Sequence, residues 1–206
     1  MSQVQQVRGL VLASESPRRR EILSQLGVSF RIVPSGIDER ALPGETPEAH
    51  VQRLACEKGL EVRSRLQSSS NDAERACILS ADTIVLVAGQ VYGKPVDDAD
   101  ALRMLQTLAG QTHRVLTALA LCEVGGEYRD ALLLTTEVTF RAVDRGTLER
   151  YVASGEARDK AGSYAIQGLG AGLVRAIHGS YTNVVGMPAA ETVEMLDRAG
   201  VLRSWP

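Results

Sequence analysis

The stretch "CILSADTIVLVAGQVYGKP", residues 77–95, decides the fold because it combines a largely apolar strand pattern with polar residues inside it. Its first part predicts a buried strand, and the glycines that follow predict a turn and a short return strand. Asp82 and Thr83 interrupt the apolar run. A buried carboxylate costs free energy unless a cation or a metal accompanies it. The stretch therefore predicts a sheet strand with a polar site inside it, unless Asp82 merely caps a turn or pairs with a core arginine.

Helix and strand patterns alternate on both sides of this stretch. Further strands are expected at 9–14 and 28–35, at 112–124 and 128–140 as a hairpin joined through Gly125 and Gly126, and as a final hairpin or strand pair at 173–186. Helices are expected from Pro17 to Gly27, from Pro47 to about Leu66 with Thr46 as the cap, at 98–108 with Asp97 as the cap, at 147–154 and at 188–200. Residues 67–74 form a polar linker, and 155–172 are too rich in glycine for regular structure. The pattern predicts an α/β protein with two lobes around one cleft.

The segment "SESPRRREIL", residues 14–23, carries an unusual charge pattern. Ser16 is expected at the N-cap and Pro17 in the first helical turn, which places the arginines 18–20 at the helix start. Cations are unfavourable there, because the free N–H groups and the helix dipole already make this end positive. The segment therefore predicts a site for an anion such as a phosphate.

Four other polar residues can be interpreted either as functional or as ordinary surface residues. Glu39 in "IDE" and Lys94 in "GKP" suit an ordinary solvated loop and turn, and Lys58 in "LACEKG" suits a solvated helix face. Gln167 lies in "DKAGSYAIQGLGAG", which lacks the strand–turn–helix spacing of a dinucleotide fingerprint and suits either a ligand loop or a mobile one. Together with Asp82, these residues supply carboxylates for a divalent cation, lysines for phosphates and an amide for a base. This combination suits a nucleoside triphosphate. No P-loop or nucleophile elbow is present.

The composition excludes several classes of protein. A net charge of -2 and 4% aromatic residues argue against stable nucleic-acid binding. The three cysteines are scattered and the three histidines are dispersed, which indicates a reducing compartment and no histidine metal site. His113 is expected to be a satisfied strand histidine. The beginning of the chain shows no signal peptide and no apolar run reaches membrane-span length, so a cytoplasmic protein is expected.

Four ordered blocks of the chain resemble the Maf family of nucleoside triphosphate pyrophosphatases. They are "LVLASESPRRREIL", "ILSADTIVLVAGQVYGKP", "LAGQTHRVLTALAL" and "DKAGSYAIQGLG" with "GSYTNVVGMP". The resemblance implies one domain over residues 1–206, with a mixed sheet and a central cleft as in the inosine triphosphatases. It also implies a homodimer that hydrolyses the bond between the α- and β-phosphates.

The resemblance also implies roles for individual residues. Asp82 matches the proton acceptor, and Arg18, Thr83 and Gln167 match positions of substrate choice. Further positions of the family's active site are matched by Glu39, Lys58 and Lys94, and the phosphate-facing turn is flanked by Ser14 and Ser16. In this reading Glu39 and Asp82 hold a divalent cation, Mg²⁺ or Mn²⁺.

The glycine-rich block favours one branch of the family. Lys160 and Gln167 resemble the branch that acts on dTTP and UTP, because an amide both donates to and accepts from a uracil or thymine edge. Glu15, where glycine is common, and Met187, where leucine is usual, depart from the pattern. The alternatives are the 7-methyl-GTP branch, a non-catalytic nucleotide-binding regulator of septum formation, and a nucleic-acid module suggested by the arginine run.

Overall fold

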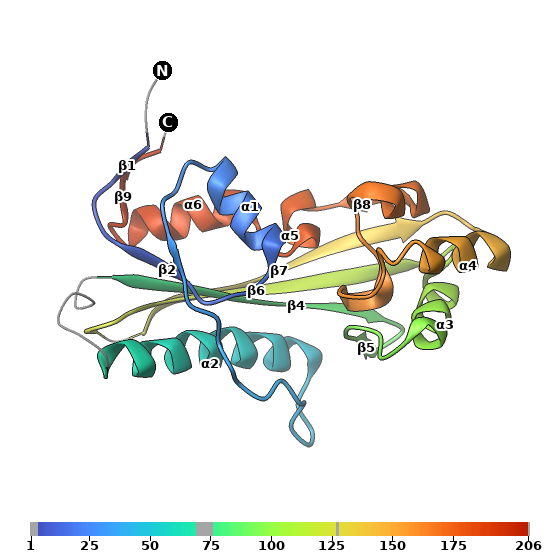
Figure 1. Ribbon diagram of the computed structural model, residues 1–206, viewed down its shortest axis with the longest axis horizontal. Coiled ribbons are helices and arrows are strands. Elements are labelled where there is room, and N and C mark those ends of the chain that lie inside the picture. Colours follow the sequence, from blue (N-terminus) through green and yellow to red (C-terminus); the bar gives the residue numbers. More distant parts are fainter. Residues whose placement is uncertain (1–3, 69–75, 127, 206) are drawn as a thin grey trace. The chain divides into compact units, whose positions relative to one another are not determined.

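The computed structural model describes residues 4–68, 76–126 and 128–205, so the predicted linker lies largely outside the described residues. Within them, the fold is α/β around a mixed seven-stranded sheet, as predicted (Figure 1). The strand order is β3-β2-β4-β6-β7-β8, and β5 pairs with β4. A separate two-stranded sheet joins β1 and β9, which the sequence did not predict.

The strands and helices have the following bounds. The strands are β1 (Gln5–Gln6), β2 (Leu10–Leu12), β3 (Arg31–Ile32), β4 (Cys77–Val87), β5 (Gln90–Tyr92), β6 (Thr112–Glu123), β7 (Tyr128–Phe140), β8 (Val174–His178) and β9 (Leu202–Ser204). The helices are α1 (Pro17–Gln25), α2 (Pro47–Gln67), α3 (Asp98–Leu108), α4 (Arg145–Ala153), α5 (Tyr181–Val185) and α6 (Ala189–Arg198), with short 3-10 helices η2 (Ala161–Ser163) and η3 (Gly168–Leu173).

Strand β4 is the strand predicted from the stretch at 77–95. It pairs in parallel with β2, with Val11 opposite Ile78, and antiparallel with β5, with Val85 opposite Tyr92. Ten of its positions are buried, and only Thr83 is half-buried. A strand covered on both faces reads as a continuous apolar run, which explains why its sequence stood out.

The chain divides into two compact units, each described by itself. Unit 1 comprises residues 1–82, 117–133 and 186–206, and unit 2 comprises 83–116 and 134–185. In unit 1, α2 lies along one side of the strands, and α1 and α6 lie along the other (Figure 1). A cluster between α2 and the sheet contains Val11, Ala13, Val62, Ile78, Cys122 and Val124. The single domain and the cleft stay predictions.

Most helix starts follow from their capping residues. Thr46 accepts a hydrogen bond from the N–H of Ala49 at 3.2 Å, and Asp97 accepts one from Asp100 at 2.7 Å. Both caps were predicted and satisfy N–H groups that lack a partner within the helix. Ser16 precedes α1 as predicted, but its side chain makes no cap hydrogen bond.

Two predicted strands differ from the structure. The strand expected at 28–35 is reduced to Arg31–Ile32. The second strand expected within 173–186 is wrong, because Tyr181–Val185 forms helix α5. Ser180 Oγ accepts from the N–H of Asn183 at 3.2 Å, which is the bond of a helix N-cap. The buried Asn183 amide donates to the Val115 carbonyl at 3.1 Å, so tertiary contacts favour the helix over a strand.

Candidate functional site

Three charged side chains of unit 1 meet at one point. The ammonium of Lys58 donates to Asp82 Oδ1 at 2.7 Å and pairs with Glu39 Oε1, also at 2.7 Å. Lys58 and Asp82 are 8% and 7% exposed, whereas the Glu39 side chain is 58% exposed. The buried carboxylate is therefore ion-paired with a lysine, as its position in an apolar strand required.

Close packing of α2 on β4 brings Lys58 to Asp82. A Cβ added at Gly59 would lie 2.8 Å from Ser80 Oγ, so a larger residue could not keep this approach. The Ser80 hydroxyl also donates to the carbonyl of Ala55 at 2.7 Å. The interpretation of Lys58 as a solvated helix lysine is wrong, and the glycine that follows it was the signal that could have shown this.

The arginines of α1 differ in their surroundings. Arg19 is 9% exposed, and its guanidinium donates to the carbonyls of Gly186 and Ala81, both at 2.9 Å. Burial lowers the pKa of Arg19, and the nearby Asp82 carboxylate opposes that effect. Arg18 is half-buried and Arg20 is exposed. The sequence did not distinguish Arg19, whose donors are committed to the protein, from its two neighbours.

Ser14 and Ser16 lie in the turn between β2 and α1. Ser14 is 7% exposed, and its hydroxyl oxygen accepts from Arg19 Nη1 at 3.1 Å and from the N–H of Ser16 at 3.2 Å. Ser14 therefore closes the turn that precedes the cationic start of α1. Ala81, whose carbonyl also accepts from Arg19, is the residue immediately before Asp82. Arg19 thus links this turn to the strand that carries the carboxylate.

Two candidate residues of unit 2 lie on linked segments. The N–H of Gly162 donates to the carbonyl of Gly93 at 3.0 Å, which connects the glycine-rich loop to the "GKP" turn. Gly162 has a φ of +69°, and a Cβ there would lie 3.0 Å from a methyl group of Val85, so glycine is required. Lys94 is exposed on this turn, and Gln167 is half-buried on the loop.

Other sequence-based candidates have simpler environments. Thr83 is half-buried on β4, next to Asp82. The ammonium of Lys160 donates to the Glu156 carbonyl at 2.8 Å and to Asp159 Oδ1 at 2.5 Å, so these bonds of Lys160 stabilise its own loop. His113 is 1% exposed, and its Nε2 shares a hydrogen bond of 2.8 Å with the Tyr164 hydroxyl. Its Nδ1 is buried without a hydrogen-bond partner among the described residues, so the expected strand histidine is only half satisfied. Burial lowers the pKa of His113 to about 4.

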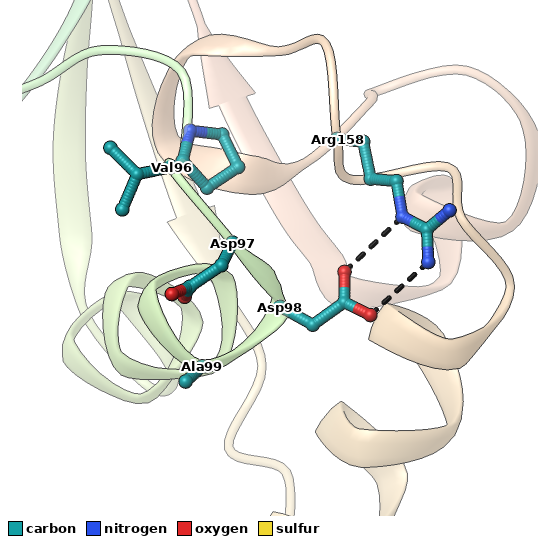
Figure 2. A pocket seen from close by; sticks show the side chains of 6 residues that line it. Val96, Asp97, Asp98, Ala99 and Arg158 are labelled. Carbon is teal, nitrogen blue, oxygen red and sulfur yellow. Dashed lines mark hydrogen bonds and ion pairs between the residues drawn. The ribbon is translucent and has the colours of Figure 1, made fainter.

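Unit 2 also contains an open pocket of about 600 Å³ that the sequence did not predict (Figure 2). Its lining is Pro95, Val96, Asp97, Asp98, Ala99 and Arg158. The Arg158 guanidinium donates to the two Asp98 carboxylate oxygens at 3.2 and 3.1 Å (Figure 2). This ion pair connects the loop before Lys160 to the start of α3. Because the charges of Arg158 and Asp98 neutralise each other, we assign no function to the pocket.

The capacity of the site to hold a metal depends on its donor atoms. Within the described ranges, no group of three or more histidine, cysteine, aspartate or glutamate side chains could hold a metal ion. Glu39 and Asp82 nevertheless supply carboxylates that meet at one ammonium. Mg²⁺ commonly takes one or two protein carboxylates together with substrate phosphates, so this pair fits such an ion. None of the three cysteines forms a disulfide bond, and none of the described helices is long and apolar enough to cross a membrane.

Comparison with known proteins shows the family to which the chain belongs. The model of the Maf-like protein family matches residues 9–199, and the chain therefore belongs to the Maf family, as its motifs predicted. A protein of Pseudoalteromonas atlantica named dTTP/UTP pyrophosphatase is 49% identical, with 92% of this chain and 96% of that protein covered. Proteins of the same name from Myxococcus xanthus and Shigella dysenteriae are 47% and 46% identical, covering 95% and 94% of both chains.

A solved structure from Mycobacterium abscessus, described as a nucleoside-triphosphatase or dITP/XTP pyrophosphatase, covers 93% of this chain and 94% of that one. Its sequence identity is 14% and its TM-score is 0.42, so this likeness carries no argument about the fold or the activity.

Proposed function

We propose that this protein is a nucleoside triphosphate pyrophosphatase that hydrolyses dTTP and UTP to the monophosphate and pyrophosphate. The observation that carries the proposal is the buried Lys58–Asp82 pair with Glu39 on its exposed side. The relatives named dTTP/UTP pyrophosphatase, which match nearly the whole chain, support the same substrate class. A cation beside a carboxylate suits a reaction in which water attacks a polyanion.

The proposed reaction is attack of water on the α-phosphorus. Asp82 orients the water and accepts its proton, as a general base. A bond forms between the water oxygen and the α-phosphorus, and the bond from this phosphorus to the oxygen bridging to the β-phosphate breaks. That oxygen leaves with the pyrophosphate. Lys58 holds the Asp82 carboxylate at 2.7 Å before substrate binds, and triphosphate oxygens then compete for its ammonium.

Cationic groups offset the negative charge that develops on the leaving pyrophosphate. Lys58 and Arg18 have this role in unit 1, and Lys94 has it in unit 2. Ser14 and Ser16 shape the turn before α1, where free N–H groups and the helix dipole favour an anion. In this proposal Glu39 and Asp82 hold a divalent cation, Mg²⁺ or Mn²⁺, which when bound polarises the phosphate oxygens.

The base preference is assigned to Gln167, with Arg18 and Thr83 contributing to substrate choice. The Gln167 amide donates and accepts at once, which matches the edge of uracil or thymine. Cytosine presents a donor where uracil presents an acceptor, so the same amide can distinguish the two. A homodimer, implied by the resemblance, and a cytoplasmic location, expected from the scattered cysteines, remain part of this proposal.

The first test is pyrophosphate release from dTTP, UTP, CTP, GTP and 7-methyl-GTP, with Mg²⁺ or Mn²⁺ and then with chelator. Metal-dependent turnover of dTTP and UTP is the expected result. A preference for 7-methyl-GTP would retain the chemistry and overturn the base assignment. Nucleotide binding without any release would favour the regulator of septum formation.

A further inference from the structure

The carboxylate of Glu156 binds the backbone of the loop that carries Gln167. Its Oε2 accepts from the N–H of Leu169 at 2.9 Å, and its Oε1 accepts from the N–H of Gly170 at 2.8 Å. Oε1 also accepts from the Tyr151 hydroxyl at 3.0 Å. Three donors thus meet one carboxylate, and two of them lie just after Gln167.

The same arrangement holds the loop just before Gln167. The Tyr151 hydroxyl oxygen accepts from the N–H of Ala165 at 3.1 Å. At Gly170, an added Cβ would lie 2.2 Å from the Ala165 carbonyl oxygen, so the two ends of the segment 165–170 approach closely. Glu156 and Tyr151 therefore fasten both ends of a short segment with Gln167 inside it.

The pKa shifts of Glu156 and Tyr151 favour these hydrogen bonds. Burial alone would raise the pKa of Glu156, but the hydrogen bonds from Gly170, Leu169 and Tyr151, together with the charge of Lys160, lower it. Burial raises the pKa of Tyr151, so its hydroxyl keeps the proton that it donates to Glu156. The hydrogen bonds to a charged acceptor are stronger than neutral ones, which favours a well-ordered loop.

Glu156 also accepts the hydrogen bonds that the side chain of an N-cap residue would usually accept. Gln167 occupies the N-cap of η3, and its side chain makes no cap hydrogen bond. An N-cap side chain usually accepts from the N–H two or three residues later, which here are Leu169 and Gly170. Because Glu156 accepts from both, the Gln167 amide is not needed as a cap.

We propose that Glu156, together with Tyr151, is a positioning residue that fixes the Gln167 amide and thereby sets the preference for uracil and thymine bases. This inference rests on the proposed function, since it deepens the role given to Gln167. Glu156 itself contacts no substrate in this proposal. Its effect passes through the backbone of residues 165–170, so its loss should change base discrimination more than the chemical step.

The experiment compares Glu156→Ala and Glu156→Gln with Glu149→Gln as a matched control. Glu149 is a half-exposed acid on α4, paired at 2.7 Å with Arg145. The measurement is equilibrium binding of the α,β-imido analogues of UTP and CTP, which report base preference without turnover. In parallel, hydrogen exchange of the Leu169 and Gly170 amides reports the loop, and UTP hydrolysis gives kcat and KM.

Glu156→Ala is expected to reduce the UTP-over-CTP binding preference about tenfold, since one oriented hydrogen bond to the base is lost. Glu156→Gln should reduce it less, because its amide oxygen can still accept from one N–H group. Exchange at both amides should accelerate, and KM for UTP should rise more than kcat falls. Glu149→Gln should match the wild type in all three measurements.

Several outcomes would overturn the proposal. One is an unchanged binding preference in Glu156→Ala despite faster exchange, and another is a wild type that binds both analogues equally. If Glu156→Ala does not fold, Tyr151→Phe, which removes the acceptor for Ala165, should lower the preference, and an unchanged preference would count against the proposal. Failure of the proposed function is separate, because it would appear as a wild type that releases no pyrophosphate from UTP.

Discussion

The Lys58–Asp82 pair of unit 1 and the Glu156 loop of unit 2 place functional groups in different ways. Lys58 and Asp82 project from the middle of helix α2 and strand β4, and core packing holds both elements. Gln167 lies on a glycine-rich loop whose backbone donates two hydrogen bonds to one carboxylate. The ion pair is thus held by a packed helix and strand, whereas Gln167 is held by a loop whose backbone is bound to the Glu156 carboxylate.

This contrast predicts that substitutions in the two regions affect different properties of the protein. Changes around Asp82 should remove the chemistry or the stability of unit 1, because a buried ion pair is costly to break. Changes around Gln167 should leave the fold intact and alter substrate choice.

The largest effect is expected for Asp82→Asn. The amide keeps the shape of the carboxylate but cannot accept the proton of water, so kcat for UTP should fall by roughly two to four decades. KM should change much less, since Lys58 and Arg18 remain. Circular dichroism checks that the variant is folded. Near wild-type turnover in a folded variant would remove Asp82 from the role of general base.

A large effect on stability is expected for Arg19→Met. The variant leaves the carbonyls of Gly186 and Ala81 and the hydroxyl of Ser14 without their guanidinium donor. The free energy of unfolding should fall by about 2–4 kcal/mol. The control is Arg20→Met, one residue along α1 and exposed, which should stay within about 0.5 kcal/mol of the wild type. Equal denaturant midpoints for the two variants would contradict a structural role for Arg19.

A smaller and pH-dependent effect is expected for His113. Its folded pKa is about 4, below the 6.5 of an ordinary histidine, because it is buried. Between these values the unfolded chain binds the extra proton, so stability is complete above pH 6.5 and is lost as the pH falls toward 4. The full loss from this group is about 3 kcal/mol.

Denaturant unfolding at pH 7 and pH 5 measures this dependence. His113→Gln cannot titrate, yet its amide can still bond to the Tyr164 hydroxyl, so stability should fall less between the two pH values than in the wild type. The same pH dependence in both proteins would show that other groups cause it.

The smallest effect is expected for Gln167→Glu. A carboxylate only accepts, so one hydrogen bond to uracil is lost and kcat/KM for UTP should fall about tenfold. Stability should change by less than about 0.5 kcal/mol, because the side chain makes no cap bond in η3. Equal kcat/KM values for UTP in the variant and the wild type would show that Gln167 does not read the base.

Local patterns in the sequence were sufficient for much of the fold. The central strand β4, the caps Thr46 and Asp97 and the hairpin of β6 and β7 were predicted because periodicity, capping and turn residues act over a few positions. The motifs also predicted the Maf family, which the family match confirmed. Helix α5 was missed although Ser180 caps its start locally, because the buried Asn183 amide that favours it bonds to Val115, a residue distant in the sequence.

The sequence alone therefore determined the α/β class, the order of most elements, the family, and the need of Asp82 for a partner. Only the tertiary structure decided that this partner is Lys58, that Arg19 is committed to protein oxygens, and that Glu156 holds the Gln167 loop. The reason is physical. A cost of burial or a capping preference can be read from neighbouring residues, whereas the identity of an ion-pair or hydrogen-bond partner depends on which distant segments the packed core brings together.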